Sequence, residues 1–353
     1  MRSSRRTVAL VACLVVLPAH AQSAEEPQAR VIEAQATPET SPAAAPTLDD
    51  IVDMEAVVVS GALPGPRMWR VSKDGHDLYI LGTLSPLPRR MEWMSREVED
   101  TIARSQAVIA PPSVAVHSDV GFFRGLALVP ALLRARNNPG KRKLREMVSP
   151  ELYARWQVLK ARYIGRDRGV EKRRPILAAQ ELYEAAMRKS GLDIENVVGK
   201  VVEKAARRAD VPVVPAEVRL AIEDPKSVLK EFNASTLADT ECFSRTMSRI
   251  ETDLGNMRAR ANAWAVGDIE ALRALPFHNQ YVDCLNAITE TGLARRLGMD
   301  DLPERVDSAW MEAAEDALAN NAVTFATLPM TQLVSGTGYI ARLRAKGYEV
   351  EAP

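Results

Sequence analysis

The chain has 353 residues, of which 46% are hydrophobic and 26% charged, and its 46 basic and 46 acidic side chains give a formal net charge of zero. This composition is typical of a globular protein, and the balance of charge argues against a dedicated nucleic-acid-binding protein. The histidines are His20, His76, His117 and His278, and no two of them have the spacing of metal ligands on one helix. The sequence has no phosphate-binding loop, dinucleotide-binding fingerprint or internal repeat.

The first residues have the pattern of a secretory signal. Arginines precede an apolar core from Val8 to Leu17, and a small-x-small cleavage site stands directly before Gln22. The alternatives are a lipoprotein box at Cys13 and a twin-arginine signal at Arg5-Arg6; the apolar run that continues past the cysteine favours plain secretion. This run is shorter than the ~20 residues that span a bilayer. We therefore expect residues 1–21 to direct export to the periplasm and to be removed, leaving no transmembrane span.

Residues 22–60 are rich in Ala, Pro, Glu, Thr and Ser and hold few large apolar side chains. Such a segment buries too little surface to offset the entropy of ordering it, so we expect a flexible tether. Ile51 to Gly61 would form either a marginal strand or the last part of the tether. Residues 61–353 are the folded part, which is long enough for one large domain or two tightly joined lobes.

A β-hairpin opens the folded part and leads to the first candidate site residue. β-Forming residues at Trp69 to Val71 and at Leu78 to Leu81 flank Asp74-Gly75, a pair suited to a tight turn. The second strand runs through Gly82 to Ser85, after which prolines stop it. Small, bendable turns after strands are where α/β sheets commonly place site residues. Ser85 is such a candidate, although no base stands beside it in the sequence.

The next segment predicts a helix, a strand and an apolar stretch. Ser95 is placed to cap a helix, and Ala107 to Ala110 predicts a strand that ends at Pro111. Gly121 to Leu133 is the most apolar stretch after the signal, and it predicts either a core helix or a flap that faces a membrane or a partner.

Basic residues cluster in the region 134–174, directly after this apolar stretch. They are Arg134, Arg136, Lys141, Arg142, Lys143, Arg145, Lys160, Arg162, Arg166, Arg168, Lys172, Arg173 and Arg174. Runs of this kind are commonly solvated faces. In a chain of zero net charge they also make one positively charged region, which would suit an anionic membrane or an acidic partner.

The centre of the chain is predicted to be helical around one αβ unit. Ser149-Pro150-Glu151 is a helix start, and the aromatic residues that follow it have the spacing of a core-facing helix. Val197 to Ala206 predicts a helix that leads to a buried strand, Val211 to Val214. Glu217 follows, and its place in the pattern is typical of the start of a helix over Val218 to Ile222.

The remainder is predicted as helices and then a C-terminal αβ unit. From Lys226 to Leu275 the pattern is helical, and Gly267-Asp268 permits one helix to end and the next to begin. The C-terminal unit predicts a strand over Ala322 to Leu328, a loop over Leu333 to Gly338, a helix over Tyr339 to Lys346, and a final strand over Tyr348 to Val350.

Several landmarks resemble the TraB/GumN family, relatives of the Tiki-type metalloproteases. They are Trp69-Arg70-Val71, Leu78 to Thr83, Arg174-Pro175, Glu217, Trp264 to Asp268, Glu304-Arg305-Val306 with Trp310, and Gly347 to Val350. The resemblance extends from Met68 to Val350. It implies an α/β (α+β) fold whose central sheet of short strands is built from the N- and C-terminal parts of the domain, with a large helical insertion.

The resemblance also implies candidate site residues. The family's first Gly-x-x-His ends at Ser85 here, its strand-ending Glu matches Pro111, and its second Gly-x-x-His ends at Gln332. Glu217 matches an acidic family position, and Arg305 matches an arginine that faces the family site. The expected remnant of the site is therefore a cleft lined by Ser85, Glu217, Arg305 and Gln332.

The residues at the family's metal-ligand positions, Ser85, Pro111 and Gln332, determine which function we expect. Metal-dependent hydrolysis needs about three protein ligands and an open position, and a hydroxyl, a proline and a neutral amide do not supply them. We expect a catalytically inactive relative, without metal or cofactor, that binds an envelope protein or a glycan and contacts anionic membrane through the 134–174 region. The alternative is an active, peptidase-like hydrolase with a rebuilt site that uses Glu217, Arg305 and a histidine from elsewhere.

Cys242 and Cys284 are the only cysteines that follow the signal. Because an exported protein passes through an oxidising compartment, we expect a disulfide between them. Two buried free thiols are the alternative.

Overall fold

The structure is a computed structural model that describes residues 63–89, 91–117, 122–234, 237–277, 298–299 and 301–353. These residues belong to the unit Ala45–Pro353. The predicted signal, the tether and the suggested strand at Ile51 to Gly61 lie outside the described residues, so they stay predictions.

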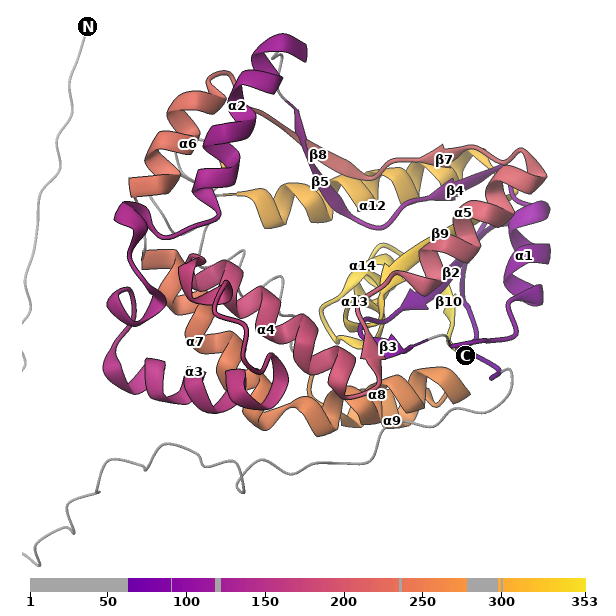
Figure 1. Cartoon of the computed structure of the whole chain (residues 1–353). Helices are drawn as coiled ribbons and strands as arrows, with labels where there is room; N and C mark the ends of the chain where they lie inside the picture. Colours follow the sequence, from indigo (N-terminus) through magenta and orange to yellow (C-terminus); the bar gives the residue numbers. More distant parts are fainter. Residues whose placement is uncertain (1–62, 90, 118–121, 235–236, 278–297, 300) are drawn as a thin grey trace, which may run out of the picture. The chain divides into compact units, whose positions relative to one another are not determined.

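A six-stranded sheet lies at the centre of the fold (Figure 1). Its strands are β1 Trp69–Lys73, β2 His76–Thr83, β4 Ala107–Ile109, β7 Val213–Val214, β9 Val323–Pro329 and β10 Glu349–Glu351, in the order β10-β1-β2-β9-β4-β7. β1 is antiparallel to both β2 and β10, whereas β2, β9, β4 and β7 are parallel to one another. The predicted α/β fold, with a sheet built from both ends of the domain, is confirmed.

The opening hairpin forms as the sequence predicts. Asp74 and Gly75 have φ angles of 52° and 85°, the left-handed values that a two-residue hairpin turn needs at both central positions. This turn pairs Lys73 with His76, and the resulting register places Val71 opposite Leu78, both fully buried.

The strand β9 forms the centre of the hydrophobic core. Its residues from Thr324 to Leu328 are all buried, as expected for a parallel strand that is covered on both faces. The helix α1, Arg96–Ala103, packs against β9, and α12, Leu302–Asn320, packs against β2 and β4.

The other helices come in two blocks, one between β5 and β7 and one between β8 and β9. The first block is α2 Phe122–Ala135, α3 Pro150–Tyr163, α4 Pro175–Lys189 and α5 Val197–Ala209; the second includes α6 Pro225–Ala234, α7 Leu237–Thr252, α8 Leu254–Val266 and α9 Ile269–Ala274. The blocks join where α3 and α4 pack against α7. Two short helices, α13 Met330–Val334 and α14 Tyr339–Ala345, follow β9.

Two parallel strands that follow β4 and β7 form a separate two-stranded sheet. β5, Ser113–His117, follows β4 and pairs with β8, Glu217–Ala221, which follows β7. The strands β3, Leu87–Pro88, and β6, Leu192–Asp193, form a separate antiparallel pair.

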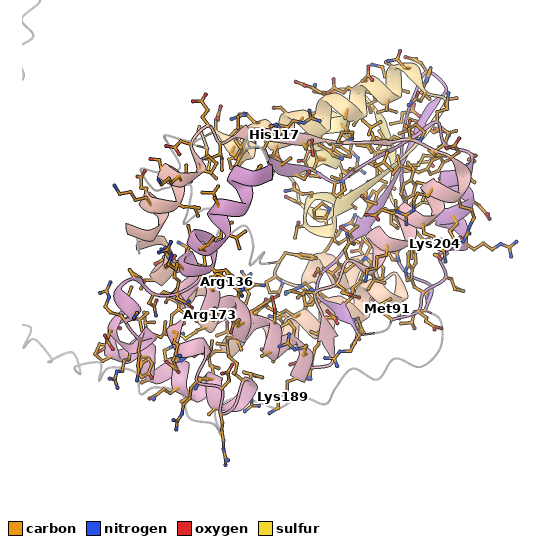
Figure 2. The ribbon with its side chains drawn as sticks, turned by 45° about the horizontal axis from the view of Figure 1, so that its top comes forward. Met91, His117, Arg136, Arg173, Lys189 and Lys204 are labelled. Atoms are coloured by element: carbon orange, nitrogen blue, oxygen red, sulfur yellow. The ribbon has the colours of Figure 1, made fainter. Side chains whose placement is uncertain are left out.

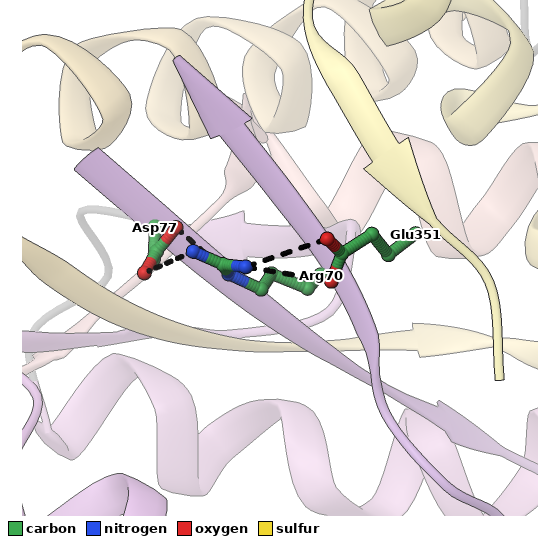
Figure 3. A network of polar contacts seen from close by, with 3 residues as sticks. All are labelled: Arg70, Asp77 and Glu351. Carbon is green, nitrogen blue, oxygen red and sulfur yellow. Dashed lines mark hydrogen bonds and ion pairs between the residues drawn. The ribbon is translucent and has the colours of Figure 1, made fainter. Parts of the chain in front are cut away.

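An ion network ties the C-terminal strand to the hairpin (Figure 3). The Arg70 guanidinium donates to both carboxylate oxygens of Asp77, at 3.0 and 3.1 Å, and to Glu351 of β10 at 3.4 Å. The three residues lie on adjacent strands, so the network fixes the register of β10, β1 and β2.

Several helix ends agree with their sequence signals and one does not. The Ser149 hydroxyl accepts from Leu152 N–H at the start of α3, and the Asp268 carboxylate accepts from Ala271 N–H at the start of α9, which begins after α8 ends at Gly267. Ser95 precedes α1, but its hydroxyl donates to Glu99 at 2.7 Å and does not cap the helix.

Other predictions were wrong. The strand near Val211 to Val214 is shorter than predicted, and its residues Val213 and Val214 are 50% and 37% exposed because β7 is an edge strand. The segment after Glu217 is the strand β8 and not a helix. The helix α13, which packs against β2 and β9, overlaps the start of the loop expected over Leu333 to Gly338.

The apolar stretch forms α2, but the part with described side chains is not a core helix. Val129, Leu132 and Leu133 are exposed, and α2 packs against α6. No helix in the described part of the chain is both long and apolar enough to cross a membrane.

Candidate functional site

The carboxyl ends of four neighbouring parallel strands meet at one edge of the sheet. The register pairs Thr83 with Pro329, and Ile109 with both Ala326 and Val214, so the four strands point to the same edge and β2 and β9 run three residues past β4 and β7. Ligands of parallel sheets bind outside the carboxyl ends of the strands. The segments that leave this edge therefore form the candidate site.

Three positions that the sequence singled out directly follow these strands. Ser85 is two residues beyond β2, Pro111 is two residues beyond β4, and Gln332 is three residues beyond β9. Because the strands are neighbours in the order β2-β9-β4, the fold brings these distant parts of the sequence to adjacent strand ends. That their side chains face one cleft stays a prediction.

The side chains at these positions offer hydrogen bonds and not metal ligands. Ser85 is exposed, and its hydroxyl donates to the carbonyl oxygen of Ile194 at 3.4 Å. Gln332 is half-buried in α13, and Pro111 is exposed. A hydroxyl, an amide and a proline ring do not fit a divalent metal site of the kind that the family resemblance implies.

The turn before Ser85 is fixed by packing that sequence reasoning missed. The indole N–H of Trp264, in α8, donates to the carbonyl oxygen of Gly82 at 2.8 Å. On its other side Gly82 lies so close to Met330 and Leu333 of α13 that a side chain at this position would collide with them. The Thr83 hydroxyl also donates to Leu328 O at 3.2 Å and joins β2 to β9. In the sequence, the signal for this contact is Trp264, which the pattern alone assigns to a family landmark at the end of a helix.

Glu217 and Arg305 are each held by a local partner. Glu217 opens β8, and its carboxylate accepts from Arg219 at 2.9 Å. The Arg305 guanidinium donates to Gly298 O at 3.0 Å and lies 3.5 Å from the Asp301 carboxylate. Within the described residues, no hydrogen bond or ion pair joins either side chain to the other.

Hydrophobic contacts place Arg305 beside the β5–β8 pair of strands. Leu302 and Val306, which flank Arg305 on α12, pack with Val218 and Leu220 of β8. The structure therefore places Arg305 near the strand that Glu217 opens, while Ser85 and Gln332 follow the neighbouring strands β2 and β9.

The two histidines among the described residues lie away from this edge. His76 opens β2, so the length of the strand, about 23 Å at ~3.3 Å per residue, separates it from Thr83. Its Nδ1 is 2.7 Å from Asn321 O. His117 ends β5, about 13 Å along the strand from Ser113. His278 lies outside the described residues.

A half-buried polar cluster around the buried Tyr339 anchors α14, the helix that follows α13. The Tyr339 hydroxyl donates to Asp307 of α12 at 2.7 Å, and Arg342 donates to the same carboxylate at 2.9 Å. The Tyr339 ring centroid lies 4.7 Å from that of Trp310. Burial, followed by the interaction with Asp307, raises the pKa of the Tyr339 hydroxyl well above its ordinary value.

The residues at the candidate site and a sequence comparison together indicate the family to which this chain is related. Across the described residues, no group of three or more His, Cys, Asp or Glu side chains is arranged to hold a metal ion. No curated protein and no solved structure matches the chain. A family model, however, matches residues 67–352, from the start of the hairpin to the last strand. The chain belongs to the TraB/PrgY/gumN family.

Proposed function

We propose that this protein is an exported member of the TraB/PrgY/gumN family that lacks metallohydrolase activity and acts by binding. The observation that carries the proposal is the trio Ser85, Pro111 and Gln332 at three adjacent strand ends. At these positions the family resemblance implies His, Glu and His. Without them the chain lacks the ligand set that would hold and activate a metal-bound water.

The groups that remain favour a polar ligand. The Ser85 hydroxyl and the Gln332 amide both donate and accept hydrogen bonds, so they suit a neutral or anionic polar group better than a divalent cation. A glycan or a polar segment of an envelope protein has this chemistry.

The positions of the two described histidines, His76 and His117, argue against a rebuilt hydrolase that uses either of them. A serine nucleophile needs an adjacent base, and His76 and His117 each lie at the far end of a strand from this edge. Glu217, the remaining candidate base, is already paired with Arg219.

Export is the second part of the proposal, and its support is the charged start, apolar core and cleavage pattern of residues 1–21. The oxidising compartment would join Cys242 to Cys284. Cys242 is buried in α7, and Cys284 lies outside the described residues. Thiol titration of the denatured, unreduced protein should find no free thiol after signal removal, whereas two per chain would contradict the disulfide.

A hydrolase screen tests the function itself. The purified protein, with zinc, manganese or cobalt added in turn, should cleave neither peptide nor ester substrates above the rate of a S85A/Q332A variant. Metal-dependent turnover that this variant loses would favour the rebuilt hydrolase.

A further inference from the structure

An exposed apolar face runs along the end of α2. Val129, Leu132 and Leu133 are 41%, 49% and 56% exposed, and helical periodicity puts them on one face together with Arg136, which directly follows the helix. A helix of 14 residues is too short to cross a bilayer. An apolar face of this length that ends in a cation has the character of a helix that lies in a membrane interface.

The chain folds so that a second basic segment lies beside this helix end. The Asn138 N–H donates to Lys172 O at 2.9 Å, and the Arg174 N–H donates to Arg136 O at 3.2 Å. Figure 2 shows Arg136 beside Arg173 at this junction. Ala135 and Leu144 are buried, and they stand directly before and after residues 136–143. The basic segment 136–143 is therefore held against the body of the protein at both ends.

Some cations of the 134–174 region are held in ion pairs with carboxylates, and others are exposed and can contact a ligand. Arg174 is buried and paired with Asp239 at 2.6 Å, Arg173 pairs with Glu181, and Lys160 pairs with Glu171. The predicted basic region is therefore smaller than its sequence suggests. Exposed cations without an ion pair among the described residues remain beside α2: Arg134, Arg136, Lys141, Arg142, Lys143 and Lys172.

We propose that the exposed face of α2 and these six cations, which we name the basic collar, dock this protein on an anionic lipid surface. The apolar side chains would enter the boundary between headgroups and acyl chains, and the collar would meet the lipid phosphates. Charge complementarity selects lipid, because flexible lysines and arginines around an apolar helix face reach headgroups while their stems cover apolar surface. The inference is independent of the chemistry proposed for the candidate site.

Vesicle flotation tests this docking with matched variants. The purified protein should float with vesicles of phosphatidylcholine and phosphatidylglycerol at low salt, and not with phosphatidylcholine alone. Each collar cation contributes about fivefold to binding, so removal of three would lose about hundredfold, and R136E/K141E/K143E, which also adds three negative charges, should lose at least that much. The control K200E/K204E/R207E makes the same charge change on α5, away from the collar, where Lys204 is labelled in Figure 2, and should bind like the parent.

The apolar part has its own pair of variants. L132S/L133S should lower binding by at least about tenfold, whereas L132M/L133M should keep it, because methionine still buries apolar surface. All these side chains are exposed, so unchanged melting temperatures check the fold. Absence of flotation with anionic vesicles, equal flotation with neutral vesicles, or equal losses in the α5 control would each overturn the proposal.

Discussion

The indole N–H of Trp264 and the carbonyl oxygen of Gly82 form a hydrogen bond of 2.8 Å between residues 182 apart in the sequence. Trp264 is fully buried, and its ring lies edge-on to Trp93 with centroids 5.8 Å apart. The bond joins the end of the helical block to the turn that carries Ser85. The helix α8 therefore helps to hold the candidate site in place.

Replacing Trp264 tests this support. W264F keeps an aromatic ring but removes the donor to a buried carbonyl, which should cost about 1–3 kcal/mol beyond the loss of ring volume. W310F is the matched control, because Trp310 is also fully buried and its indole nitrogen has no hydrogen-bond partner among the described residues. Urea unfolding should show a larger loss for W264F; equal losses would show that the Gly82 bond contributes little.

The buried pair Arg174–Asp239 should be the most sensitive ion pair of the helical block. Its atoms are 2.6 Å apart, and the side chains are 1% and 3% exposed. D239A would leave the arginine without this partner in the core, at a cost of about 3–5 kcal/mol in unfolding free energy. E241A breaks the exposed pair with Arg245 on the same helix and should cost less than about 1 kcal/mol. Similar costs for both variants would contradict the structural role of the buried pair.

Tyr339 should make the protein less stable in alkali. Burial and Asp307 raise the pKa of its hydroxyl in the folded state, whereas an unfolded tyrosine titrates near pH ~10. Above about pH 10 the unfolded state thus binds fewer protons, and stability falls by up to ~1.4 kcal/mol per pH unit. Y339F should reduce this alkaline slope in urea unfolding, while Tyr183, whose pKa burial also raises, keeps part of it. An unchanged slope in Y339F would contradict the assignment.

Turns and helix ends could be predicted from the sequence where neighbouring residues determine them. The Asp74-Gly75 turn and the caps Ser149 and Asp268 form because nearest neighbours decide turn geometry and helix ends. The αβ order and the family landmarks gave the fold class, and they located Ser85 and Gln332 after their strands.

Features that depend on distant contacts could not be predicted in the same way. Val213 and Val214 have the composition of a buried strand, but the sheet ends at β7 and leaves them exposed. The apolar residues of α2 suggested a core helix, yet burial depends on which elements the fold places against it. The contact of Trp264 with Gly82 and the pairing of Arg174 with Asp239 likewise require the tertiary structure.

The central claim is that three adjacent strand ends have lost a metal-ligand set, and zinc titration followed by melting temperature tests it most directly. The native protein should show no saturable rise. The variant S85H/P111E/Q332H should gain one, because metal at ~100 times its dissociation constant adds about 2.7 kcal/mol, while each single substitution should not. A saturable rise in the native protein, abolished by S85A/Q332A, would contradict the claim, as would a triple variant that binds no zinc.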